Sequence, residues 1–179
     1  MIAKVKKVLD RTLEILVMVV VAVLVIDVLW QVFTRFVLKD PSSWTEELAI
    51  FLLIWVALLG AAVALNRGAH LGIDYFVGKF NKKTRLYVEI FAFFCIACFA
   101  FCVMILGGID LVQTILHLEQ KSPALGIEMG YVYLAIPISG FFMLLYSVLA
   151  FAERLLLCLK HPEKIKTFQF QHEVLEELD

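Results

Sequence analysis

The feature that most constrains this chain is a run of eighteen uncharged residues, Leu48–Leu65. At about 1.5 Å per residue, a helix of that length crosses most of a hydrocarbon layer of about 30 Å. Backbone groups in lipid must bond within their own segment, so the run predicts a transmembrane helix. Hydrophobic residues make up 62% of the chain, against about 45–50% in soluble domains.

Three further apolar runs accompany this one. With it they predict an all-α membrane protein: a single domain over residues 1–179, whose last residues, 160–179, form a polar tail. The predicted transmembrane helices span residues 12–36, 44–66, 88–112 and 129–154. Pro137 lies inside the fourth and predicts a kink, because proline lacks the N–H that the helix needs.

The second span has polarised ends. Ser43 is expected to cap its N-terminus, with the Glu46 side chain reaching back to the cap. Glu46 and Glu47 place negative charge at the positive end of the helix dipole, and Arg67 places positive charge at the other end. Trp44 is positioned as an interfacial anchor.

The same span carries a stripe of small residues. They form two pairs with four-residue spacing, a pattern that favours close approach of a neighbouring helix. The stripe residues are Ala57, Gly60, Ala61 and Ala64. The neighbour would be a helix of this chain or of a larger partner.

The first span contains a polar face. Asp27, Gln31 and Arg35 recur at four-residue spacing and therefore stack on one side of a helix. An acidic residue near mid-depth costs on the order of 2.5–3.5 kcal/mol on insertion scales, so Asp27 is expected to face protein, with Gln31 bridging toward Arg35. One interpretation is an ion or proton site. The interpretation we favour is interhelical hydrogen bonding, within the chain or to a partner.

The sequence offers little catalytic or cofactor chemistry. Cys95, Cys98 and Cys102 share one helical face, but no histidine or carboxylate accompanies them, so buried apolar filler is expected rather than a metal site. No histidine lies within an apolar run, and no phosphate-binding or nucleophile motif is present. We expect no cofactor, no enzymatic activity and no nucleic-acid partner.

Charge distribution predicts the orientation. Thirteen of the 16 Lys and Arg residues lie before residue 12, between 66 and 85, or after 153. Positive charge marks the cytoplasmic side, so both termini are expected inside, with the loops 37–43 and 115–128 outside. The connection 67–85 is expected to include a short interfacial segment.

Two stretches resemble one known family. Trp44-Thr45-Glu46-Glu47-Leu48-Ala49, continuing through Trp55–Ala62 to Arg67-Gly68-Ala69-His70-Leu71, is similar to the DctQ-type small membrane subunit of tripartite ATP-independent periplasmic (TRAP) transporters. Gly130–Gly140, which includes Pro137, resembles a second, weaker signature. The resemblance covers roughly residues 10–158.

The resemblance implies a three-part system in the bacterial inner membrane. A periplasmic binding protein would capture a carboxylate solute such as sialic acid or a C4-dicarboxylate. A large membrane subunit would move the solute with a cation gradient. This chain would form a stable heterodimer with the large subunit, brace it among the membrane lipids and help dock the binding protein transiently. The candidate docking charges are Arg35, Lys39, Asp40, Glu119, Lys121 and Glu128.

Physical reading of the residues, without the resemblance, leaves other functions open. A four-span scaffold or assembly protein unrelated to transport is the main alternative. A small membrane enzyme or electron carrier is a further alternative.

Overall fold

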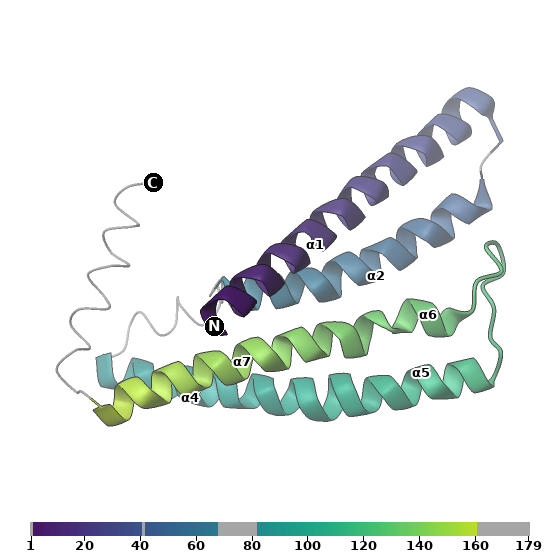
Figure 1. The fold of residues 1–179 in the computed structure, drawn as a ribbon. Coiled ribbons are helices and arrows are strands. Elements are labelled where there is room, and N and C mark those ends of the chain that lie inside the picture. The colour runs from purple at the N-terminus through teal and green to yellow at the C-terminus, as the bar shows by residue number, and fades with distance from the viewer. Residues whose placement is uncertain (1, 41, 68–81, 161–179) are drawn as a thin grey trace, which may run out of the picture.

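The computed structural model describes residues 2–40, 42–67 and 82–160, and its long elements are all helices (Figure 1). His70, the predicted interfacial segment and the tail beyond Lys160 lie outside the described residues. The elements are α1 (Ile2–Phe33), the π-helical η1 (Thr34–Leu38), α2 (Ser43–Asn66), α4 (Lys82–Phe99), the π-helical η2 (Ala100–Gly107), α5 (Gly108–His117), α6 (Met129–Tyr133) and α7 (Ala135–Lys160).

Among the described residues, four stretches of helix are long and apolar enough to cross a membrane, which confirms the predicted class. They are Leu9–Leu38, Ser43–Asn66, Leu86–His117 and Met129–Leu156. The third runs five residues past its predicted end at 112. Asp110 there lies on the exposed side while Val112 and Ile115 are buried, so the helix continues beyond its last uncharged stretch.

The helices are arranged as a layer. α2 packs between α1 and α7, and α7 packs between α2 and the continuous helix α4–η2–α5 (Figure 1). The spatial order is therefore α1, α2, α7, α4, in which α1 is an edge.

The buried core lies toward one end of this layer. Leu13 of α1, Leu59 of α2, Phe93 of α4 and Tyr146 of α7 belong to one buried cluster. α1 and α2 diverge from there toward their other ends (Figure 1). The four spans thus converge at the core, and α1 is left widely exposed further along.

Among the described residues, two ion pairs lie at the core end, which we call the ion-pair end. Arg67 at the end of α2 contacts Glu14 of α1, with Nη2 2.9 Å from Oε1. Arg154 of α7 contacts Glu89 of α4, with Nε 2.8 Å from Oε2. Each pair joins two neighbouring helices of the layer.

Glycines set the contact between the third and fourth spans. A Cβ at Gly140 would lie 2.6 Å from Met104 Cβ, and one at Gly130 would lie 2.5 Å from the Leu116 side chain. Gly108 is also close to its neighbours, with a Cβ falling 3.1 Å from Pro137 Cδ. These glycines let the two spans approach more closely than any other residue would allow.

The fourth span is interrupted where proline predicts it. α6 ends at Tyr133 and α7 begins at Ala135. Pro137 has no N–H for the Tyr133 carbonyl, four residues earlier, so the regular hydrogen-bond ladder is lost there.

Two local predictions are wrong. The N-cap of α2 is Ser42 rather than Ser43, and it makes no side-chain cap bond, because its hydroxyl lies 2.6 Å from the Thr45 hydroxyl instead. The three cysteines expected as buried filler are exposed and unpaired. Their helical face points away from α7, toward the surface that an apolar helix presents to lipid.

Candidate functional site

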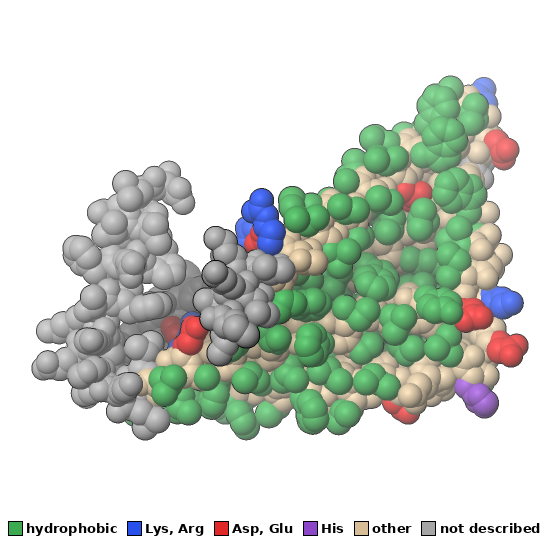
Figure 2. Space-filling view, in the orientation of Figure 1, with side chains coloured by type: hydrophobic (Ala, Val, Ile, Leu, Met, Phe, Trp, Pro, Cys, Tyr) green, Lys and Arg blue, Asp and Glu red, His purple; other side chains and the backbone are tan. Residues whose placement is uncertain are grey.

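Charged side chains gather at the end of the layer opposite the ion-pair end. Residues 39, 40 and 42, together with 118–128, form this short-loop end. In Figure 2 acidic and basic side chains mark this edge, at the right, while hydrophobic side chains cover the helices between the two ends.

Glu47 of α2 anchors the loop 118–128. Its Oε2 accepts a very short hydrogen bond from the Ser122 hydroxyl and two more from the backbone N–H groups of Ala124 (3.1 Å) and Leu125 (3.0 Å). Ser122 is itself buried. A carboxylate that accepts three bonds is a strong tie, because hydrogen bonds to charged groups exceed neutral ones. Glu47 therefore joins α2 to the connection between α5 and α6.

The anchored loop also has internal structure. Ser122 N–H donates to Ile127 O (2.8 Å), and Met129 N–H donates to Gln120 O (2.9 Å). The backbones of Lys121 and Glu128 form an isolated antiparallel β-bridge across the loop. Gly126 turns it with a φ of +67°, a conformation that glycine adopts without strain. The loop is a defined surface held by α2.

Five of the six predicted docking charges lie at this end, and Arg35 lies just before it, in η1. The charges that follow α1 are separated across the layer from the charges of the loop 118–128, because α1 is the edge helix. The first group is Arg35, Lys39 and Asp40, and the second is Glu119, Lys121 and Glu128. Arg35, Lys39, Asp40, Glu119 and Lys121 are exposed, and Glu128 is half-buried.

The small-residue stripe faces out of the layer. Ala57, Ala61 and Ala64 are exposed, and a Cβ at Gly60 would meet nothing within 4 Å. α2 packs against its neighbours through other positions instead, including the fully buried Leu59 and Ala62. The close contacts inside the chain use the glycines of the third and fourth spans.

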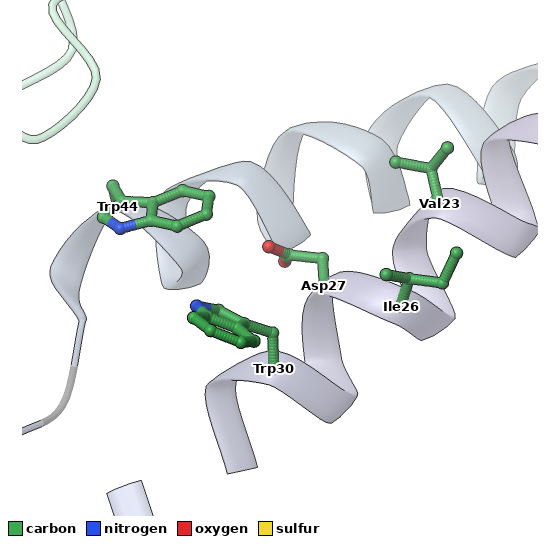
Figure 3. A pocket seen from close by; sticks show the side chains of 5 residues that line it. All are labelled: Val23, Ile26, Asp27, Trp30 and Trp44. Atoms are coloured by element: carbon green, nitrogen blue, oxygen red, sulfur yellow. The ribbon is translucent and has the colours of Figure 1, made fainter. Parts of the chain in front are cut away.

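Asp27 is buried against α2, with 6% of its surface exposed. It lines an open groove of about 360 Å³ between α1 and the start of α2, and the other lining residues are Val23, Ile26, Trp30 and Trp44. Figure 3 shows the carboxylate aimed into the space between Trp30 and Trp44. Within the described part of the chain, no side-chain hydrogen bond joins Asp27 to Gln31 or Arg35, so the expected bridge through Gln31 is absent.

The family-motif residues have separate positions. Trp44 is 41% exposed at the groove, Glu46 is exposed, and Arg67 is paired with Glu14. The sequence analysis placed Glu47 and Arg67 at the two ends of the helix dipole and identified neither of their partners, Ser122 and Glu14. Ser122-Pro123 signalled a turn, but nothing in the sequence identifies which side chain holds it.

Comparison with known proteins gives a consistent result. Residues 24–157 match the family of tripartite ATP-independent periplasmic transporters, DctQ component. The sialic acid TRAP transporter small permease protein SiaQ of Vibrio cholerae is 30% identical over 142 residues, covering 77% of this chain and 78% of that protein.

Two further relatives differ in length and solute. The C4-dicarboxylate TRAP transporter small permease protein DctQ of Rhodobacter capsulatus is 33% identical over 100 residues, or 56% of this chain and 44% of that one. The isethionate TRAP transporter permease protein DctMQ of Oleidesulfovibrio alaskensis is 29% identical over 98 residues, or 55% of this chain but only 15% of that longer protein.

Proposed function

Because the chain belongs to the DctQ component family of TRAP transporters, and is thus a multi-pass transporter subunit rather than an enzyme, we propose a specific role for it. It binds the large membrane subunit stably, braces that subunit in the bilayer and helps dock a periplasmic binding protein. The family match carries this proposal. The DctMQ relative supports the association, because its similar region is part of a much longer permease.

The short-loop end is the proposed docking surface. It presents exposed charges of both signs, including Lys121 and Glu119, on a loop that Glu47 holds in place. Exposed charges at a rim speed encounter in a salt-dependent way more than they add affinity. Docking at this surface requires the short-loop end to face the periplasm and both termini to face the cytoplasm, in the bacterial inner membrane.

The proposed solute is a carboxylate of the sialic acid or C4-dicarboxylate class, taken up with a cation. The names of two relatives, SiaQ and the Rhodobacter DctQ, support a solute of this kind. Selectivity is expected to reside in the binding protein and the large subunit, since the groove here has a single carboxylate and apolar walls.

Reconstituted uptake tests the role. Proteoliposomes would contain this chain, the large subunit or both, with the binding protein added outside and a sodium gradient imposed. We expect uptake of labelled solute only when all three proteins are present. Uptake by this chain alone, or undiminished uptake without it, would contradict the proposal.

Gly60→Leu tests whether the exposed stripe contributes to the complex. A leucine there has open space in the isolated chain, so its thermal stability is expected to stay unchanged. Close packing against the large subunit would be blocked, and less of that subunit would copurify in detergent. Unchanged recovery would show that this face contacts lipid.

A further inference from the structure

Asp27 has a property that helix packing within this chain does not explain. Its side chain is more than nine-tenths buried, yet Oδ2 has no hydrogen-bond partner among the described residues. A buried carboxylate without a partner is unfavourable, and native structures rarely tolerate one. The carboxylate of Asp27 projects from α1 toward the start of α2 (Figure 3).

The depth of Asp27 limits what could satisfy it. It lies eleven residues before Leu38, the end of its span, and eighteen after Leu9. The nearer end is therefore about 16 Å away along the helix. Ionisable residues within membrane spans face protein or a water-filled cavity and pair with other groups there, so a partner on another membrane helix fits this position.

The walls of the groove are apolar and largely exposed. Val23, Ile26 and Trp30 are 42%, 67% and 48% exposed, and they surround the buried carboxylate with apolar surface. This arrangement suits a membrane helix that is apolar along its length and has one polar side chain at the level of Asp27. Polar side chains bond across helices in this way inside membranes.

We propose that a transmembrane helix of the large subunit occupies this groove and donates a hydrogen bond to the Asp27 carboxylate, whose small exposed part faces the groove. This inference rests on the proposed function, which supplies the partner. The donor is an amide, hydroxyl or cationic side chain, because a carboxylate oxygen is an acceptor. Asp27 is thus an assembly residue whose partner belongs to the other subunit.

Two substitutions test the hydrogen bond. Asp27→Leu removes the acceptor, and Asp27→Asn keeps one. In the isolated chain Asp27→Leu should raise the melting temperature, since it removes an unpaired polar group. With the co-expressed large subunit, Asp27→Leu should lower the affinity of the two subunits about 3- to 10-fold, while Asp27→Asn stays within about two-fold of the wild type. A lower melting temperature of the isolated Asp27→Leu chain, or an unchanged affinity, would overturn the inference.

Photocrosslinking tests the location. A photoreactive phenylalanine analogue replaces Ile26 in the groove or, as a matched control, Val25, which is 52% exposed on the opposite side of α1. We expect a crosslink to the large subunit from position 26 and not from 25. Equal crosslinking from both positions, none from 26, or a crosslink to a second copy of this chain would overturn the inference.

The two proposals fail in different ways. If the unsubstituted chain does not copurify with the large subunit, the proposed function is wrong. If it copurifies but Asp27→Leu and the position-26 probe have no effect, the function stands and the groove is not the contact.

Discussion

At the residue scale, three glycines outside the small-residue stripe make the close helix contacts within this chain. Gly108, Gly130 and Gly140 each have a neighbouring side chain within 3.1 Å of where a Cβ would be. Gly60, although it belongs to the more regular pattern, has open space beside it. The four-residue spacing of small residues shows that one face of a helix has small side chains. It does not show whether another helix of the same chain packs against that face.

Gly140→Ala is expected to destabilise the isolated chain by about 1–3 kcal/mol, the usual cost of inserting a methyl into a packed site. Met104 Cβ, 2.6 Å away, is close to the backbone and cannot rotate aside. Gly60→Ala is the matched control and should not destabilise the chain. Thermal unfolding in detergent measures both, and similar losses from the two variants would contradict the packing described here.

Glu46 and Glu47 are adjacent carboxylates with different roles, so they form a second matched pair. Glu47→Gln should weaken three hydrogen bonds and speed amide exchange at Ala124 and Leu125 by about ten-fold, or about 1.4 kcal/mol. Glu46→Gln, at an exposed position, should leave exchange there unchanged. Equal effects of the two substitutions would show that negative charge at the helix N-terminus, rather than the hydrogen bonds of Glu47, protects these amides from exchange.

At the element scale, the two ion pairs join different pairs of helices, and their side chains differ in how much of their surface is exposed. Arg67 is 64% exposed in its pair with Glu14, so solvent screens most of their attraction. Arg154 and Glu89 are 28% and 21% exposed, and the Arg154 guanidinium also lies 4.3 Å from the centre of the Phe93 ring. The contact between α4 and α7 is therefore the better protected of the two.

Arg154→Met should lower the free energy of unfolding by about 1–2 kcal/mol, since it removes a shielded pair and a cation–π contact but keeps the aliphatic stem. Arg67→Met should cost less than about 1 kcal/mol. Denaturant titration in detergent at low and high salt compares them. A larger loss for Arg67→Met would mean that the α1–α2 pair is less screened than its exposure indicates.

At the scale of the whole molecule, the layer leaves α1 as an edge with little covering. In its most apolar stretch, only 6% of the residues of the first span are buried, against 28% in the fourth. An edge helix that packs chiefly on α2 and is exposed over much of its remaining surface offers a long surface to a second protein. The layered shape thus suits a subunit better than an independent carrier, which needs a central enclosed path.

Membrane orientation is tested by thiol labelling in spheroplasts. Lys121→Cys at the short-loop end should react with a membrane-impermeant maleimide added outside. Glu153→Cys, exposed near the ion-pair end, should react only after permeabilisation. The unsubstituted chain gives the background from its native cysteines. The reverse pattern would place both termini in the periplasm.

The amino-acid sequence by itself determined the class of the protein, the number of spans and most of their ends. Hydrocarbon thickness and backbone hydrogen bonding act on one segment at a time, so local sequence is enough to reveal their effect. The α2 boundaries, the burial of Asp27 and the interruption before Pro137 all follow from such local constraints.

The tertiary structure alone decided which faces meet. The Glu47 carboxylate and the Ser122 hydroxyl are 75 positions apart in sequence, and Arg67 and Glu14 are 53 apart. Apolar helices have nearly uniform surfaces, so hydrophobic periodicity cannot reveal which side packs inward. Contact between such helices depends on shape and on a few polar pairs, and both exist only once the helices are placed together. For the same physical reason, the missing partner of Asp27 became evident only in the folded chain.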